Sequence, residues 1–252
     1  MFFFTFALSF YRQYNFEMTN IFNEPKLLDR LAFKILIRSL CGSTFITLFF
    51  LVAGRLDWIR GWAYVGLLTV GQTASAIYIW RRDPELLTMR SKIGKGSKKW
   101  DKILLGLFGI TYLGILITSA LDVRYSWSTM SRLLWPVGSV LYAFFIVIIT
   151  WAMDVNRFFE KTVRIQTDRG HHVIDSGPYR FVRHPGYIAT ILGFILAAPL
   201  LLGSWWAFIP AFLSFACILI RTILEDRTLQ MELPGYKEYT KRVRYRLLPR
   251  IW

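Results

Sequence analysis

Hydrophobic residues occur along this chain in long uninterrupted blocks rather than in short alternations. Three blocks contain no Asp, Glu, Lys or Arg: Gly61 to Trp80, Ile103 to Leu121 and Leu133 to Met153, with 20, 19 and 21 residues. At about 1.5 Å per residue, each block is long enough as a helix to cross a hydrocarbon layer about 30 Å thick. The pattern therefore predicts three membrane-spanning helices.

A shorter block near the N-terminus predicts one more span. Ser39 to Gly54 gives only 16 uncharged residues. It reaches the length of a span when it is extended back to Leu31, with Lys34 and Arg38 stretching toward the lipid headgroups.

The last block is too long for a single span. From His184 to Ile220 there are 37 residues without a formal charge, and one straight helix of that length would measure about 55 Å. Pro199, Gly203 and Ser204 allow the chain to turn back near the middle. We therefore predict an all-α, polytopic membrane protein with about six transmembrane helices. The last two form a hairpin, and a short cytoplasmic C-terminal helix follows near Lys237–Val243.

The basic residues alternate between the connecting segments and indicate an orientation. Of the 31 Lys and Arg residues, 27 lie in alternate segments that include both termini, and 4 lie in the others. The positive-inside rule places the rich side, with both termini and the candidate site, in the cytoplasm. The net charge of +15 then reflects topology and attraction to the lipid bilayer. Nucleic-acid binding is disfavoured because these charges lie in short loops beside spans.

The polar residues divide the chain near Asp154 into two halves of one integrated domain. Residues 1–153 form a four-span scaffold, whereas residues 154–252 contain all three histidines and the hairpin. Cys41 and Cys217 stand alone, so no metal site is expected. Walker, Gly-x-Gly-x-x-Gly and Gly-x-Ser-x-Gly patterns are missing from the sequence, which argues against a P-loop nucleotidase, a Rossmann dehydrogenase and a serine hydrolase.

Two polar clusters flank the hairpin. One is the segment Gly177–Tyr187, which reads GPYRFVRHPGY, and the other contains Arg221 and Glu225. Arg221 and Glu225 are four residues apart and share one helix face, which is also the pattern of a simple intrahelical ion pair. His184 precedes a proline that suits the first turn of a helix, where it either binds a ligand or makes a local hydrogen bond. If the hairpin closes, the two clusters meet.

These motifs and their spacing resemble the isoprenylcysteine carboxyl methyltransferase family, in its prokaryotic-type branch. The resemblance covers about the last hundred residues. It implies an integral membrane methyltransferase that uses S-adenosylmethionine and acts on a lipophilic or membrane-associated acceptor, with a carboxylate favoured. Arg221 would be catalytic and face the acceptor. The predicted cofactor-binding residues are Gln166, His171, His172, Val173, Ile174, Tyr179, His184, Pro185, Gly186, Tyr187 and Glu225.

Two other classes of function stay open on the sequence. Sterol-type reductases, which use NADPH, have a similar C-terminal half, but they carry Arg-His-x-Asn-Tyr where this chain has Arg183-His184-Pro185-Gly186-Tyr187. The proline favours methyl transfer. A non-catalytic accessory protein of the membrane is the other alternative. A metal bound by His171, His172 and Asp175 is disfavoured because adjacent histidines point in different directions.

Overall fold

A computed structural model describes residues 42, 44–90, 93–94, 96–249 and 251–252. Within these residues the chain forms helices and no strand. A helix over Thr44–Ala53 comes first. The elements that follow are α3 (Ile59–Arg82), α4 (Pro84–Arg90), α5 (Lys99–Tyr125), α6 (Leu134–Val155), η1 (Thr167–Arg169), η2 (Gly177–Arg180), α7 (Pro185–Thr190), the π-helical η3 (Ile191–Leu196), α8 (Ala197–Leu202), α9 (Phe208–Glu232) and α10 (Tyr236–Arg242).

Four helices in the described part of the chain are long and apolar enough to cross a membrane. They are α5, α6, α9 and the continuous helix Pro185–Leu202 made of α7, η3 and α8. They coincide with four of the predicted spans, and they identify an integral membrane protein.

The predicted number of six spans is not confirmed. The α3 helix has 24 residues, but Gln72, Thr73 and Ser75 lower the hydropathy of its sequence, and it is not among the four apolar helices. Half of the predicted first span, Leu31–Gly54, lies outside the described residues, and its described half contains the short apolar helix Thr44–Ala53.

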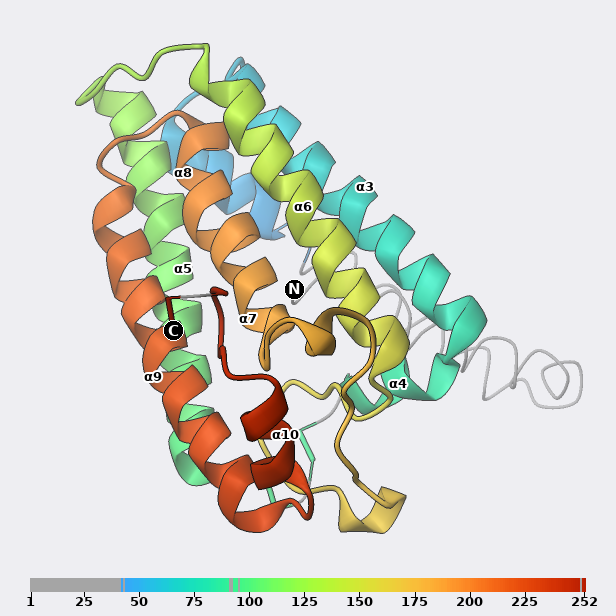
Figure 1. Ribbon diagram of the computed structural model, residues 1–252. Coiled ribbons are helices and arrows are strands. Elements are labelled where there is room, and N and C mark those ends of the chain that lie inside the picture. The colour runs from blue at the N-terminus through green and yellow to red at the C-terminus, as the bar shows by residue number, and fades with distance from the viewer. Residues whose placement is uncertain (1–41, 43, 91–92, 95, 250) are drawn as a thin grey trace, which may run out of the picture.

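The predicted hairpin turns at Gly203. This glycine ends α8 with a left-handed φ of 81°, a conformation that favours glycine because it has no Cβ. Ser204 follows and donates from Oγ to Oδ2 of Asp122 at 2.5 Å. The same buried carboxylate accepts hydrogen bonds from the backbone N–H and the hydroxyl of Ser128. This cluster closes the end of the bundle opposite α10 (Figure 1).

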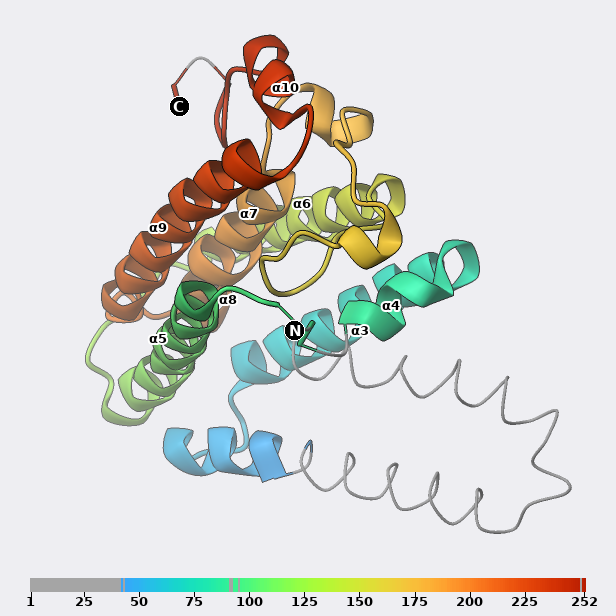
Figure 2. The same ribbon diagram turned by 90° about the horizontal axis from the view of Figure 1, so that it is seen from below.

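The helices pack into a bundle in which α5 lies along α9, and α6 lies between α3 and the helix Pro185–Leu202 (Figures 1 and 2). One contact is especially close, because a Cβ at Gly193 would overlap the ring of Phe145. The absence of a side chain at position 193 therefore brings η3 and α6 together at mid-membrane depth.

The many charges of the segment Arg81–Lys102, with Gly94, Gly96 and Ser97 near its centre, predict a flexible loop, but the segment contains the helix α4. Pro84 occupies the first helical position, where its fixed φ favours helix formation, and Glu85 in the first turn complements the helix dipole. Leu86 and Leu87 are buried in the main core. Tertiary burial therefore orders a segment whose charged composition suggested a solvated loop.

The C-terminal helix was predicted near Lys237–Val243 and is observed as α10, one residue earlier. It packs through Tyr236, Tyr239 and Val243 in a small separate core. Beyond it, the backbone N–H groups of Arg183 and His184 donate to the carbonyls of Tyr245 and Arg246 at 2.9 and 3.0 Å. The tail is therefore fixed to the start of α7.

Candidate active site

One cavity of about 190 Å³ lies at the α10 end of the bundle. It is bounded by α3, α4, α6, α7, α9, α10 and the segment 156–184. All twelve residues predicted for cofactor and acceptor line it: Gln166, His171, His172, Val173, Ile174, Tyr179, His184, Pro185, Gly186, Tyr187, Arg221 and Glu225. The fold therefore brings the predicted site residues to one place, although their roles remain predictions.

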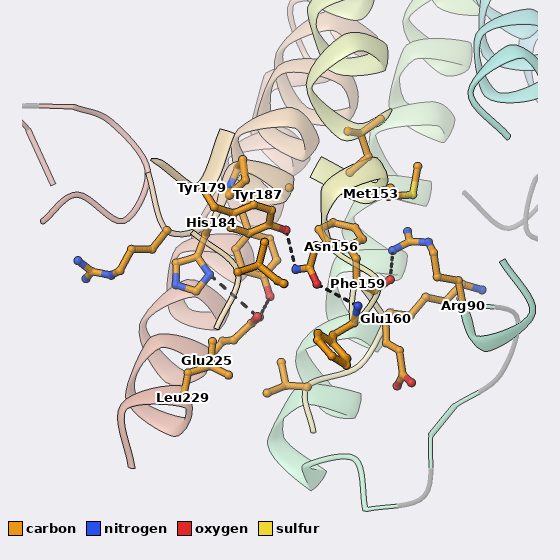
Figure 3. A pocket seen from close by; sticks show the side chains of 18 of the residues that line it. Arg90, Met153, Asn156, Phe159, Glu160, Tyr179, His184, Tyr187, Glu225 and Leu229 are labelled. Carbon is orange, nitrogen blue, oxygen red and sulfur yellow. Dashed lines mark hydrogen bonds and ion pairs between the residues drawn. The ribbon is translucent and has the colours of Figure 1, made fainter. Parts of the chain in front are cut away.

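The two polar clusters that flank the hairpin meet at Glu225. The hydroxyl of Tyr187 donates to Oε2 of Glu225, and Nδ1 of His184 lies 4.0 Å from Oε1 (Figure 3). The rings of His184 and Tyr187 stack with their centres 5.7 Å apart. His184 directly precedes α7, which begins at Pro185. Glu225 thus presents a half-buried carboxylate to the cavity, held by residues from the other arm of the hairpin.

A tyrosine and an asparagine form a second polar group in the cavity wall. Asn156 Nδ2 donates to the hydroxyl of Tyr179 at 3.0 Å. Burial raises the pKa of Tyr179 above its usual value, so its phenol stays neutral at physiological pH. Tyr239 of α10 donates to the carbonyl of Tyr179 at 2.7 Å, which ties the tail helix to the same wall.

Arg221 makes a buried ion pair that the sequence did not predict. Its Nε donates to Oδ1 of Asp101 at 2.6 Å and its Nη2 to Oδ2 at 3.3 Å. Nη2 also donates to the carbonyl of Lys161, and the guanidinium lies 5.4 Å from the ring centre of Tyr187. Asp101 is completely buried. Arg221 is therefore paired with α5 rather than with Glu225, and the face-sharing ion pair is not formed.

The residue after Glu225 is the centre of a larger network. Asp226 is completely buried and accepts two hydrogen bonds from Arg183, at 2.8 and 3.0 Å. It also accepts bonds from Arg246 Nε at 3.0 Å and the Tyr236 hydroxyl at 3.2 Å, and His184 Nε2 lies 3.3 Å away. One carboxylate thus joins α9, the start of α7 and the tail.

The segment before η1 is held by Gln166 and His171. Gln166 is buried, its Nε2 donates to the carbonyl of Phe158 at 2.7 Å and its Oε1 accepts from Arg169 at 2.9 Å. The backbone N–H of Gln166 donates to Nδ1 of His171 at 3.3 Å, and the His171 ring packs on Phe158. The Gln166 side chain thus fixes the shape of the wall, and whether it also contacts a cofactor stays a prediction.

The buried ring of His171 predicts that the protein loses stability in mild acid. Burial, reinforced by the charge of His172, lowers the pKa of His171 from 6.5 to about 4. Between these values the unfolded chain binds a proton that the folded chain does not, so stability falls as pH drops from about 6.5 toward 4. We expect the melting temperature of the purified protein to fall over this range, and the fall to be smaller in His171→Phe.

His172 provides the matched control for this experiment. Its ring is more exposed than that of His171, and His172→Phe should keep the acid-dependent fall. Equal pH profiles for wild type and His171→Phe would contradict the assignment of the effect to His171.

The lining of the cavity has a polar part, called here the polar arm, and a mostly apolar part, called here the apolar arm. The polar arm lies at the α10 end, among His171–Ile174, Tyr179, Glu225 and Tyr236. The apolar arm runs between α3 and α6 and is lined by Ala76, Phe145, Ile149 and Met153, with Gln72 and Ser75. From Met153 to Phe145 it follows α6 for about 12 Å toward the membrane interior. The cavity can therefore accept a polar molecule at one end and a hydrocarbon chain at the other.

Several residues of the site were missed by the sequence analysis, namely Arg90, Asp101, Asn156 and Asp226. Asp101 and Arg90 lie in the half of the chain that was interpreted as scaffold. They are far from the motifs in the sequence, so nothing in the sequence indicates that they lie near the site. Asp226 directly follows a predicted site residue, so a charged residue at the end of an apolar helix was a usable sign. No group of three metal-binding side chains occurs among the residues described by the structure.

Comparison with known proteins supports one family. Residues 139–231 match the model of the isoprenylcysteine carboxyl methyltransferase (ICMT) family. The matched region contains most of α6, the segment 156–190 and nearly all of the hairpin, including Arg221 and Glu225. No curated protein matches the chain. The family match suggests a membrane methyltransferase, and it supports the assignment of this chain to the isoprenylcysteine carboxyl methyltransferase family.

Proposed function

We propose that the protein is an S-adenosylmethionine-dependent methyltransferase that methylates a lipophilic acceptor at the membrane surface. The observation that carries this proposal is one cavity whose lining joins all twelve predicted residues to apolar side chains of α6. Such a lining suits a polar cofactor at one end and a lipophilic acceptor at the other. The charge distribution favours a site that faces the cytoplasm.

The chemistry of the cavity fits the cofactor. S-adenosylmethionine supplies an activated methyl group on a sulfonium cation. Glu225 would bind its positively charged amino end, and the faces of Tyr179 and Tyr187 suit a cation through interactions of about 0.5–2 kcal/mol. The segment His171–Ile174 would offer backbone groups to the adenine. A neutral Tyr179 phenol is a poor nucleophile, so it would not compete with the acceptor for the methyl group.

The residues of this chain contribute alignment and exclusion of water. Methyl transfer is an in-line displacement, so holding donor and acceptor at the correct separation can lower the barrier by about 7–11 kcal/mol. The docked tail covers the polar arm, and the helices α3 and α6 enclose the apolar arm. Arg221, fixed by Asp101 beside Tyr187, is proposed to orient the acceptor at the junction.

The test is thermal stabilisation by S-adenosylhomocysteine, the product form of the cofactor. A ligand at a hundred times its dissociation constant adds about 2.7 kcal/mol of stability, so the melting temperature of the detergent-purified protein should rise clearly. Glu225→Gln removes the negative charge that is proposed to bind the amino end of the ligand. Most of the rise in melting temperature should then disappear.

Glu232→Gln is the matched control, because Glu232 lies on the same helix and forms an exposed pair with Lys98. It should respond to S-adenosylhomocysteine as the wild type does. If the melting temperature rises with NADPH and not with S-adenosylhomocysteine, the methyltransferase proposal is wrong and the reductase is favoured. No rise with either ligand would favour an accessory protein.

A further inference from the structure

Arg90 is a buried cation at the side of the cavity. It is the last residue of α4, it lines the cavity, and only 6% of its surface is exposed. Its Nη1 donates to the carbonyl of Phe159 at 2.9 Å, and its guanidinium lies 4.7 Å from the Phe159 ring centre (Figure 3). A carbonyl and a ring face do not neutralise a full positive charge, so a bound anion would stabilise the buried guanidinium.

The carboxylates around Arg90 are committed to other residues. Asp101 is paired with Arg221, and Glu160 accepts two hydrogen bonds from Arg164. Glu225 accepts a hydrogen bond from Tyr187. Within the described part of the chain, no carboxylate forms an ion pair with Arg90.

Two other cations, Arg221 and Lys161, lie near Arg90 at the cavity. Burial and the repulsion of Arg221 lower the pKa of Arg90 to about 10. Burial and the charge of Arg90 lower the pKa of Lys161, another cavity residue, to about 8. Burial is the larger cause of both shifts, and the repulsion from neighbouring cations adds to it.

We propose that Arg90 is the anion-binding residue of the cavity and holds a carboxylate of a molecule bound there. A guanidinium has five N–H groups in a planar fork that matches a carboxylate, and burial strengthens such charge-assisted bonds. Two bound molecules could supply the carboxylate, namely the amino-acid end of the cofactor and the polar end of an acidic acceptor. The proposal rests on the proposed function for this choice of ligands.

The experiment uses two pairs of probes that differ in one charged group. The first pair is S-adenosylhomocysteine and its decarboxylated analogue, and the second is oleate and oleyl alcohol in dodecylmaltoside micelles. Affinities are measured by thermal stabilisation of wild type, Arg90→Met and Arg90→Lys. In at least one pair we expect Arg90→Met to weaken binding of the carboxylate member about tenfold or more, to spare the other member, and Arg90→Lys to restore part of the loss.

The outcomes distinguish the two sources and the two proposals. A loss confined to S-adenosylhomocysteine assigns the carboxylate to the cofactor, and a loss confined to oleate assigns it to the acceptor. Unchanged affinities in Arg90→Met overturn the role of Arg90. A wild type that shows no preference for the carboxylate member in either pair overturns it as well. If the wild type does not bind S-adenosylhomocysteine, the proposed function fails, but the oleate pair still decides about Arg90.

Two controls guard against a folding defect. Arg157→Met removes an arginine that forms only an exposed pair at 3.9 Å with Glu85, and it should leave all four affinities unchanged. If Arg90→Met does not fold, Arg90→Lys carries the comparison, because it keeps the charge and loses the fork. Equal affinity of Arg90→Lys and wild type for every carboxylate would then count against the proposal.

Discussion

Asp101→Asn is expected to destabilise the protein by about 3–5 kcal/mol, the usual effect of removing one partner from a buried ion pair. Asp101 is fully buried and bonded to Arg221 through both oxygens. An asparagine has nearly the same shape but no charge, so it leaves the guanidinium without compensation inside the helix bundle. The measurement is the melting temperature in detergent, followed by methyl transfer once an acceptor is known.

A double-mutant cycle separates the structural and the catalytic role of Arg221. In Asp101→Asn combined with Arg221→Met, neither charge remains, and much of the lost stability should return. If Arg221 orients the acceptor, the double variant stays inactive although it is stable. Recovery of both stability and turnover would show that Arg221 serves only to neutralise Asp101. A single Asp101→Asn variant as stable as wild type would contradict the importance of the pair.

Asp226→Ala is expected to release the C-terminal tail and to cost about 3–5 kcal/mol of stability. Asp226 binds Arg183, Arg246 and Tyr236, so its loss leaves two arginines without their carboxylate. Because Leu233, Tyr236 and Tyr239 line the polar arm of the cavity, binding of S-adenosylhomocysteine should weaken as well. Limited proteolysis should then cleave the tail faster than in wild type.

Asp175→Asn is the matched control for this prediction. Asp175 also ties α10 to the cavity wall, through Arg242 at 2.9 Å, but both side chains are about half exposed. An exposed pair contributes little, so this variant should keep its tail protected and its affinity unchanged. Equal proteolysis rates for Asp226→Ala and Asp175→Asn would show that the buried network does not hold the tail.

The long apolar blocks of the sequence predicted the later helices well. The predicted spans Ile103–Leu121 and Leu133–Met153 lie within or almost within α5 and α6, and the long block turns at Gly203 as expected. Hydrophobicity determines these elements because a spanning helix must be apolar over the whole thickness of the hydrocarbon layer. The more polar α3 and the region before residue 42 lack so strong a signal, and the count of six stays unconfirmed.

The family resemblance named twelve site residues, and the fold brings them to one cavity, but their roles stay predictions. Pairing between distant residues was not accessible. Asp101 and Arg221 are 120 residues apart, and Arg90 belongs to a segment that looked like a loop until its leucines were found in the core.

The apolar arm of the cavity changes the meaning of concentration for any molecule that enters through it. Phe145 and Ile149 belong to α6, a helix that can cross the membrane. If the proposed lipophilic acceptor enters this arm from the bilayer, it arrives by diffusion in two dimensions, and its supply is set by its mole fraction among the lipids rather than by its amount per litre. The polar cofactor proposed for the other arm comes from a three-dimensional aqueous pool, so the two substrates of one cavity would come from reservoirs that are diluted independently.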